Sequence, residues 1–251
     1  MVTGEKQFLL EIGLHRDRVE SFDAYPFSLS AVRNLDRLEL HPRVTFIIGE
    51  NGAGKSTLLE AIAVAFGFNP EGGSRGFNFT TRASHSELHE YLVLTRGLKT
   101  PRDGFFLRAE SFFNLATEIE HLDEVEANAP KIGPAYGERG LHEQSHGESF
   151  LSLLTKRFFG NGLYILDEPE AALSPNRQMA VLPRMHELTS EGSQFIVATH
   201  SPIIMAYPHA WIYQLFDDGI RKVAYTDTEH FVVAKSFLND HEKMLSILLE
   251  E

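Results

Sequence analysis

Apolar and polar positions follow two different periods along the chain. FLLEIGL and RLEL near the beginning alternate as strands do, and VTFII is the continuous apolar run of a buried central strand. Residues 55–66 then have the period of a helix. Further on, LYILD and QFIVAT are again strand-like, with helical patterns at residues 148–159 and 175–189. The alternation predicts an α/β fold, with a mostly parallel central sheet flanked by helices after an N-terminal antiparallel β portion.

The pattern is looser between residues 69 and 143. EYLVLTR and GFFLRAE flank a turn-rich segment as in a hairpin, SFFNLATEIEHLDEV has helical spacing, and a Pro/Gly-rich stretch follows. We therefore expect one domain over residues 1–251, with 69–143 as an inserted α/β lobe. The end of the chain predicts a hairpin that turns at Asp218-Gly219, followed by a terminal helix.

Composition and charge narrow the class of protein. The chain has 251 residues, no cysteine and a formal net charge of -12. No apolar run approaches the roughly 18 to 20 residues that cross a bilayer, so we expect a cytoplasmic protein without a membrane partner. The acidic balance works against unaided DNA binding, because nonspecific affinity for nucleic acid depends on a surface rich in Lys and Arg.

The segment GENGAGKS fits the pattern G-x-x-x-x-G-K-[ST] between a predicted strand and a predicted helix. Its glycines let backbone N–H groups converge on a phosphate. Lys55 is expected to reach the β- and γ-phosphates, and Ser56 to sit on Mg²⁺. Thr57 either assists at the α-phosphate or has a structural role in the first helical turn. The candidate nucleotide-binding residues of this loop are Gly49, Asn51, Gly52, Gly54, Lys55, Ser56 and Thr57.

Three further side chains follow two buried strands. Asp167 and Glu168 come directly after LYIL, and His200 comes directly after FIVAT. Beside a phosphate loop, one carboxylate can bind Mg²⁺ through water and the next can polarise the attacking water. Adjacent carboxylates in a loop and a structural histidine are the alternative interpretations.

The order of the phosphate loop, QSHGES, ILDEPEAALS and ATHSP resembles the ATP-binding cassette superfamily. The resemblance is strongest to its soluble branch, which includes RecF-type and structural-maintenance-of-chromosomes-type heads and small predicted AAA family ATPases. Ser145 lies 22 residues before Asp167, close to the spacing of about twenty between the signature and the carboxylate strand in that branch. The motifs lie in residues 7–66 and 144–216, so the resemblance does not cover the middle of the chain.

The resemblance implies a set of roles. Ser145, Gly147 and Glu148 would form the signature that closes over ATP bound to a second subunit, although Ser-x-Gly-Glu is also an ordinary helix cap. Asp167 would support Mg²⁺, Glu168 would be the general base and His200 the switch histidine, with Lys55 as the third catalytic residue. Residues 171–174 would cross the dimer seam, and adenine would stack on one of three aromatics: Phe22, Tyr25 or Phe27.

Two positions depart from the superfamily pattern. Residues 57–143 contain no glutamine where the superfamily places one that senses Mg²⁺ and the attacking water; Glu110 is the candidate replacement. Ser174 also stands where many relatives have aspartate, which puts the coupling of the two sites in doubt.

These residues favour a soluble ATPase with ATP and Mg²⁺ as cofactors and an ATP-dependent, head-to-tail homodimer. DNA repair and phage defence are the candidate processes, with an effector protein as a possible partner. One alternative is the ATPase subunit of a transporter, against which the missing glutamine and the unusual signature count. Another is a nucleotide-gated binding module whose turnover is incidental. A small-molecule kinase has little support, since it needs neither SHGES nor DEPE.

Overall fold

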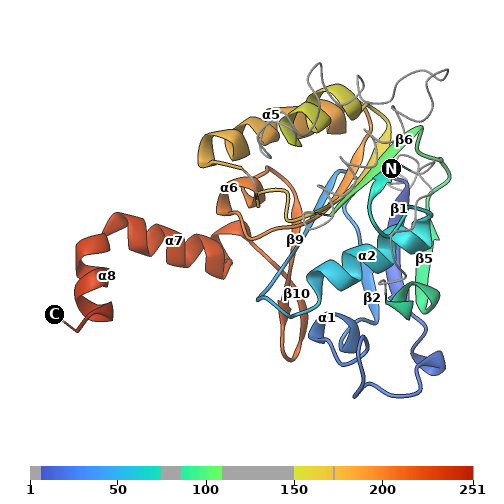
Figure 1. Ribbon diagram of the computed structural model, residues 1–251, viewed down its shortest axis with the longest axis horizontal. Coiled ribbons are helices and arrows are strands. Elements are labelled where there is room, and N and C mark those ends of the chain that lie inside the picture. The colour runs from blue at the N-terminus through green and yellow to red at the C-terminus, as the bar shows by residue number, and fades with distance from the viewer. Residues whose placement is uncertain (1–6, 75–85, 109–149, 172, 251) are drawn as a thin grey trace, which may run out of the picture.

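The computed structural model describes residues 7–74, 86–108, 150–171 and 173–250. The chain folds around two β-sheets that share helix α2 between them (Figure 1). Within the described residues, no helix is long and apolar enough to span a membrane.

The small sheet is antiparallel and has the strand order β2-β1-β5. Its strands are β1 (Leu9–Leu14), β2 (Arg37–Glu39) and β5 (Leu92–Arg96). The predicted N-terminal antiparallel portion is thus present. Its third strand, β5, comes after helix α2 in the sequence. Ile12 of β1 is buried and lies opposite Leu38 on one side and Leu94 on the other.

The large sheet has the order β10-β9-β3-β8-β7-β6-β4 among the described residues. Its five inner strands are parallel, and the two edge strands are antiparallel to their neighbours. Every residue of the central strands β3, β7 and β8 is buried, which explains their continuous apolar runs. The strands are β3 (Val44–Ile48), β4 (Gly73–Ser74), β6 (Asp103–Arg108), β7 (Gly162–Asp167), β8 (Gln194–Ala198), β9 (Trp211–Phe216) and β10 (Gly219–Val223).

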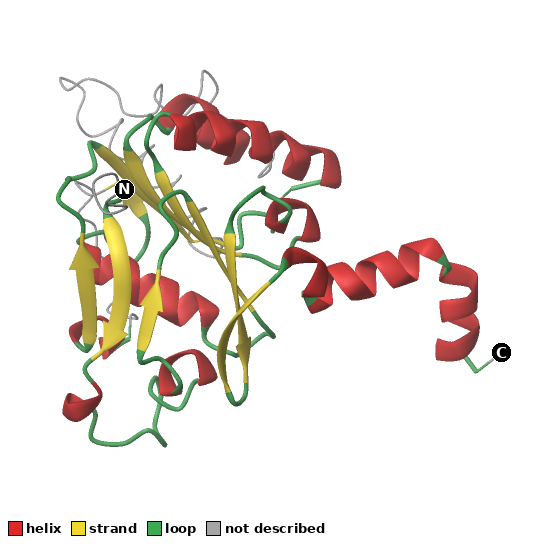
Figure 2. Cartoon of the chain, turned by 180° about the vertical axis from the view of Figure 1, so that it is seen from behind, coloured by secondary structure: helices red, strands yellow, loops and turns green. Residues whose placement is uncertain are grey.

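Helices cover both faces of the large sheet, as predicted. Helix α2 and the small sheet lie on one face, while α5, α6 and η5 pack on the other, around Tyr164 and Phe195. Figure 2 shows α2 and α5 on opposite sides of the twisted sheet. The helical segments are η2 (Arg16–Arg18), α1 (Ser30–Arg33), α2 (Lys55–Phe66), η3 (Glu87–Glu90), η5 (Leu153–Arg157), α5 (Pro175–Ser190), α6 (Pro202–Met205), η6 (Tyr225–Asp227), α7 (Glu229–Asn239) and α8 (His241–Leu248).

A buried glutamine joins the two sheets. The Oε1 of Gln194 in β8 accepts hydrogen bonds from the backbone N–H groups of Phe8 and Leu9, and its Nε2 donates to the carbonyls of Leu9 and His41. The amide therefore satisfies four backbone groups where the β-ladders do not reach them.

Two sequence predictions for the described residues are wrong in detail. EYLVLTR and GFFLRAE do not form a hairpin: β5 pairs with β1 in the small sheet, and β6 pairs in parallel with β7 in the large one. The apolar pattern showed two strands but not their partners. The C-terminal hairpin turns at Asp217-Asp218, because Gly219 already pairs with Phe216.

The middle of the chain, residues 69–143, therefore contributes strands to both sheets. Residues 86–108 belong to the body of the molecule, and the helix predicted at 111–125 lies outside the described residues. The predicted helix at 148–159 is described from Phe150, where a helical turn passes into the π-helical segment η5. We retain the single domain over residues 1–251 as a proposal.

The terminal helix is present but divided. Asp240 has φ -148° and ψ 62°, outside the helical region, and separates α7 from α8. We call residues 229–250 the C-terminal arm. It projects from the body next to β9 and β10 (Figure 1), and no residue of either helix is buried.

Candidate nucleotide site

The phosphate loop, residues 49–56, connects β3 to α2 with a backbone that requires glycine. Gly52 and Gly54 have φ values of 82° and 96°, in the left-handed region. A Cβ on Gly54 would lie 3.0 Å from the Cβ of Leu29, and one on Gly49 would lie 2.9 Å from the Cβ of Leu215. The loop is therefore held closely between α1 and β9, and its turn opens onto the N-terminus of α2.

Lys55, the first residue of α2, is almost completely buried and folds back on the loop. Its Nζ donates to the carbonyls of Gly49 and Glu50, both at 2.8 Å. Burial lowers the pKa of Lys55, whereas the nearby carboxylates of Glu168, Asp167 and Glu170 raise it. The ammonium group thus lies at the loop where the sequence predicted it.

Ser56 and Asp167 meet although 111 positions separate them in the chain. The Ser56 hydroxyl donates to Oδ1 of Asp167 at 3.1 Å. The contact arises because β3 and β7 are parallel strands of one sheet, so the loops that follow them emerge at the same edge. Two hard oxygen ligands are close together at that edge.

Glu168 has φ 47°, which is unusual for a residue other than glycine. Its N–H donates to the carbonyl of Ala198 at 2.9 Å, and this bond to β8 holds the backbone in place. Its carboxylate oxygen Oε1 lies 3.6 Å from Nε2 of His200. Backbone strain of this kind concentrates at functional sites, and here it turns the carboxylate toward the predicted switch histidine.

His200 is partly exposed, yet its Nε2 is buried and has no hydrogen-bond partner within the described residues. Burial lowers the pKa of His200, and Lys55 lowers it further, whereas Glu168 raises it. A buried imidazole nitrogen that makes no hydrogen bond can accept a ligand oxygen as its partner.

Two residues of the site were not predicted from the sequence. Glu170 accepts from Thr199 Oγ1 at 2.7 Å and from the backbone N–H of His200 at 2.5 Å, so it ties the turn after β7 to the turn after β8. Burial raises the pKa of Glu170 despite these bonds. The second residue is His230 of α7, whose Nε2 lies 3.0 Å from Nδ1 of His200. The third acidic residue of DEPE was a signal for Glu170; no motif marks His230.

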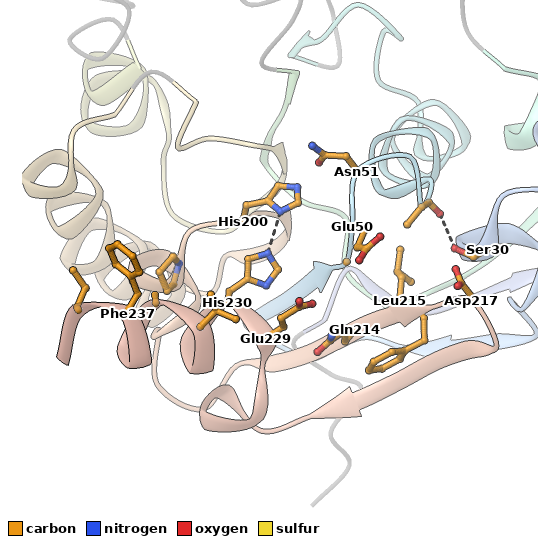
Figure 3. A pocket seen from close by; sticks show the side chains of 17 residues that line it. Ser30, Glu50, Asn51, His200, Gln214, Leu215, Asp217, Glu229, His230 and Phe237 are labelled. Carbon is orange, nitrogen blue, oxygen red and sulfur yellow. Dashed lines mark hydrogen bonds between the residues drawn. The ribbon is translucent and has the colours of Figure 1, made fainter. Parts of the chain in front are cut away.

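A cavity of about 990 Å³ lies along the outer side of the phosphate loop. It extends from Ser30 past Glu50 and Asn51 to His200 and His230, and its far wall is the apolar face of α7 (Figure 3). Lys55 and Ser56 do not line it. The cavity thus shares Gly49 and Asn51 with the predicted phosphate cradle but does not reach Lys55 and Ser56.

The three aromatics proposed for adenine differ in accessibility. Phe27 is buried and packs edge-on against Tyr91, and Phe22 is covered by the guanidinium of Arg16, 4.4 Å from its ring centroid. Tyr25 is 64% exposed. Tyr25 is thus the most exposed of the three rings, and the choice among them remains a prediction.

Several predicted site residues lie outside the described residues: Ser145, Gly147, Glu148 and Glu110. Of the predicted seam segment, Ala171 and Ser174 are exposed and Leu173 is buried. Ser174 is the N-cap residue of α5, and its carbonyl accepts from the N–H of Gln178. Thr57 is partly buried in the first turn of α2, and its role remains a prediction.

The donor set fits a nucleotide with Mg²⁺. The loop offers backbone N–H groups at a helix N-terminus, with the Lys55 ammonium and the His200 imidazole close by. Mg²⁺ is usually bound by one or two protein oxygens, with waters and phosphates completing its shell. Ser56 and Asp167 match that requirement. The described part of the chain contains no group of three or more His, Asp or Glu able to bind a metal ion by protein side chains alone.

Two family models match the chain. Residues 18–115 match an AAA domain, and residues 148–206 match a model described as an AAA domain, putative AbiEii toxin, Type IV TA system. These segments contain the phosphate loop, the turn after β7 and His200. Both matches are to AAA-type P-loop ATPase domain models.

Several relatives are ATP-binding cassette proteins. The energy-coupling factor transporter ATP-binding protein EcfA1 of Fusobacterium nucleatum is 30% identical over 62% of this chain and 62% of its own length. The G family member STR2 of Medicago truncatula is 27% identical over 63% of this chain, but the match spans only 24% of that protein. The manganese transport system ATP-binding protein MntB of Bacillus subtilis is 24% identical over 82% of this chain and 84% of its own length. The resemblance to the ATP-binding cassette superfamily is confirmed.

Solved structures give likenesses of moderate score. An ATP-binding cassette of an ABC transporter in its ADP conformation has a TM-score of 0.48, with 20% identity over 86% of this chain and 90% of its own. An SmcHead bound to the C-winged helix domain of ScpA has a TM-score of 0.43, with 16% identity over 74% of this chain and 92% of its own. At these scores the fold assignment depends on the chain's own sheet order and sequence matches.

Proposed function

We propose that this chain binds ATP with Mg²⁺ at the phosphate loop and hydrolyses it, and that two copies close head to tail over two nucleotides. The observation that carries the proposal is the meeting of three loops at one sheet edge. Lys55 follows β3, the Ser56–Asp167 pair joins β3 to β7, and the Glu168–His200 pair joins β7 to β8. These are the positions that phosphoryl transfer to water requires.

Each residue has a distinct task in this mechanism. Ser56 and Asp167 would hold Mg²⁺, which neutralises phosphate charge when it is bound. Lys55 lies in the phosphate loop and would exchange its hydrogen bonds to two loop carbonyls for hydrogen bonds to phosphate oxygens. Glu168 accepts a proton from the attacking water, and His200 donates from Nε2 to the γ-phosphate.

A Glu168→Gln variant tests the catalytic assignment. The amide keeps the shape of the side chain and cannot accept the proton, so turnover is expected to fall at least about 100-fold while ATP binding persists. Phosphate release and equilibrium binding of ATP are the measurements. Glu242→Gln, an exposed change on α8, is the matched control. Turnover unchanged in Glu168→Gln would remove Glu168 as the base.

The dimer is tested by light scattering during size-exclusion chromatography of the Glu168→Gln protein. With the base removed, Mg-ATP should convert the monomer to a dimer, because the γ-phosphate stays in place to bind the signature of the second copy. Ser145→Arg should abolish the shift. If Mg-ATP leaves the mass unchanged, the head-to-tail dimer is refuted and a monomeric nucleotide-binding module remains.

Two settings are proposed for this activity. The second family model carries a toxin and Type IV TA system description, which supports an effector partner. Phage defence and DNA repair are the processes that we propose for such a pair. The names of EcfA1 and MntB support the second candidate, a transporter ATPase. Purification from detergent-solubilised membranes separates the two: co-purification with a polytopic membrane protein supports the transporter, and its absence supports the effector.

A further inference from the structure

His230 belongs to none of the sequence motifs, yet it is the closest hydrogen-bonding partner of the switch histidine side chain. Its Nε2 lies 3.0 Å from Nδ1 of His200, and the ring centroids are 5.2 Å apart (Figure 3). The outer nitrogens, Nε2 of His200 and Nδ1 of His230, are buried and have no hydrogen-bond partner among the described residues. His230, His200 and Glu168 therefore lie in a row of successive contacts, with His200 in the middle.

The surroundings of both imidazoles favour the neutral form. Burial lowers the pKa of His230 below 6.5, and His200 lowers it further, although Glu229 and Glu170 oppose the shift. The pKa of His200 is lowered in the same way, first by burial and then by Lys55. Two neutral imidazoles share one hydrogen between the bonded nitrogens, so one ring must donate and the other accept.

The carboxylate of Glu168 decides which ring donates. If His200 donated from Nδ1, its Nε2 would present a lone pair to Glu168 Oε1 only 3.6 Å away, and the two would repel each other. If His230 donates, Nε2 of His200 carries the hydrogen and points it toward the carboxylate. The second arrangement is the favourable one.

We propose that His230 is the positioning residue of the switch histidine: it donates from Nε2 to Nδ1 of His200 and so directs Nε2–H of His200 into the nucleotide site. A hydrogen bond to the far nitrogen sets both the tautomer and the ring orientation of a functional histidine. The γ-phosphate is an anion, so a neutral His200 can bind it only as an N–H donor. This role in ATP turnover rests on the proposed function.

The same contact attaches the C-terminal arm to the nucleotide site. His230 lies in the first turn of α7, which is capped by the buried Thr228 and packed through Phe231 against Tyr225. The Tyr225 hydroxyl donates to the carbonyl of Pro202, two residues beyond His200. The base of the arm and the switch histidine thus form one hydrogen-bonded unit.

The tautomer can be measured on the full chain without nucleotide, by long-range ¹H–¹⁵N correlation spectra of protein labelled with ¹⁵N-histidine. A His200→Gln variant assigns the His200 signals among the 12 histidines. We expect a protonated Nε2 and a hydrogen-bonded imine Nδ1 in His200. In His230→Met that Nδ1 signal should move to the position of an unbonded imine. A protonated Nδ1 in the wild type, or no movement in His230→Met, would overturn the inference.

Turnover separates positioning from a merely structural role. Glutamine and methionine have nearly the same shape, but only glutamine can donate a hydrogen bond from the position of Nε2. His230→Met is expected to lower kcat about 10-fold, the lower end of losses seen on removing a partner of this kind. His230→Gln should stay within about threefold of the wild type, and KM of both should change less than kcat. Equal losses in the two variants would contradict the proposal.

His241→Met on α8 is the matched control, because it makes the same substitution at an exposed position on the same arm. Its turnover should equal that of the wild type, and a loss as large as that of His230→Met would count against the proposal. If the wild type hydrolyses no ATP, the proposed function fails, and the NMR measurement alone then decides the role of His230.

Discussion

Lys55 is a buried cation whose hydrogen bonds go to carbonyls of its own loop. The carbonyls of Gly49 and Glu50 each accept from its Nζ, while the carboxylates of Glu168 and Asp167 act on it from a greater distance. Burial without a bonded counter-ion is unfavourable, so an entering phosphate provides the partner that the side chain lacks. The loop therefore holds a buried positive charge ready to bind an anion.

Asp103 is the residue for which the structure predicts a pH-dependent stability. It accepts from the Tyr164 hydroxyl at 2.7 Å and from Arg157 at 2.9 Å. Burial alone would raise the pKa of Asp103, but these bonds bring it below the ordinary value of 3.8. A lowered carboxyl pKa stabilises the protein above the unfolded value, and this stabilisation is lost as the pH falls through the folded value.

Asp103→Asn is therefore expected to lower the free energy of unfolding by about 1 to 3 kcal/mol at pH 7, because it weakens hydrogen bonds to a charged group. The difference from the wild type should shrink as the pH falls toward 3. Urea unfolding across this range is the measurement. Asp218→Asn, which alters an exposed pair with Arg221, is the control and should change stability by less than about 0.5 kcal/mol. A pH-independent difference for Asp103→Asn would contradict the assignment.

At the residue scale, the sequence identified those candidate site residues that belong to local motifs. Asp167 and Glu168 lie at the end of β7, His200 lies just after β8, and Lys55 and Ser56 begin the helix that follows β3. Parallel strands bring their carboxyl ends to one edge of the sheet. Their meeting follows from that rule, although their roles remain proposals. His230 could not be found in this way, because its contact with His200 depends on how α7 leaves the body, which no local pattern specifies.

At the scale of elements, the period of apolar residues predicted strands and helices well but not strand partners. Each central strand and both long helices, α2 and α5, occur where the pattern placed them. Strands β5 and β6 were expected to pair because they are adjacent in sequence, yet each joins a different sheet. Burial explains the difference: β6 is buried along four consecutive residues, as an inner strand must be, whereas β5 is mostly exposed.

The C-terminal arm is the element least tied to the rest of the molecule. Helices α7 and α8 have no buried residue, so we expect their amides, and those of α8 above all, to exchange with solvent at least about 100-fold faster than the amides of α5. Hydrogen exchange read by mass spectrometry measures this. Mg-ATP should slow exchange in the first turn of α7, which contains His230, and leave α8 unchanged. Protection of α8 equal to that of α5 would contradict the expectation.

At the scale of the whole molecule, charge limits the partners that the protein can bind alone. The formal net charge is -12, and affinity for a DNA backbone depends on the release of cations by a basic surface. We expect no retention of duplex DNA by the isolated protein at 200 mM salt, with or without Mg-ATP. A gel-shift titration at 50 and 200 mM salt tests this. Tight binding that weakens steeply with salt would instead indicate a local basic surface.

The close packing around the phosphate loop has a consequence for how a ligand enters it. Gly49 touches β9 and Gly54 touches Leu29, so the turn is held from both sides within the chain itself. A phosphate that arrives need not order a flexible segment, and its binding free energy is not reduced by lost chain entropy. Binding and release of the phosphate can then be fast, and the slow step in the proposed dimer is the movement of the second copy that closes over the loop.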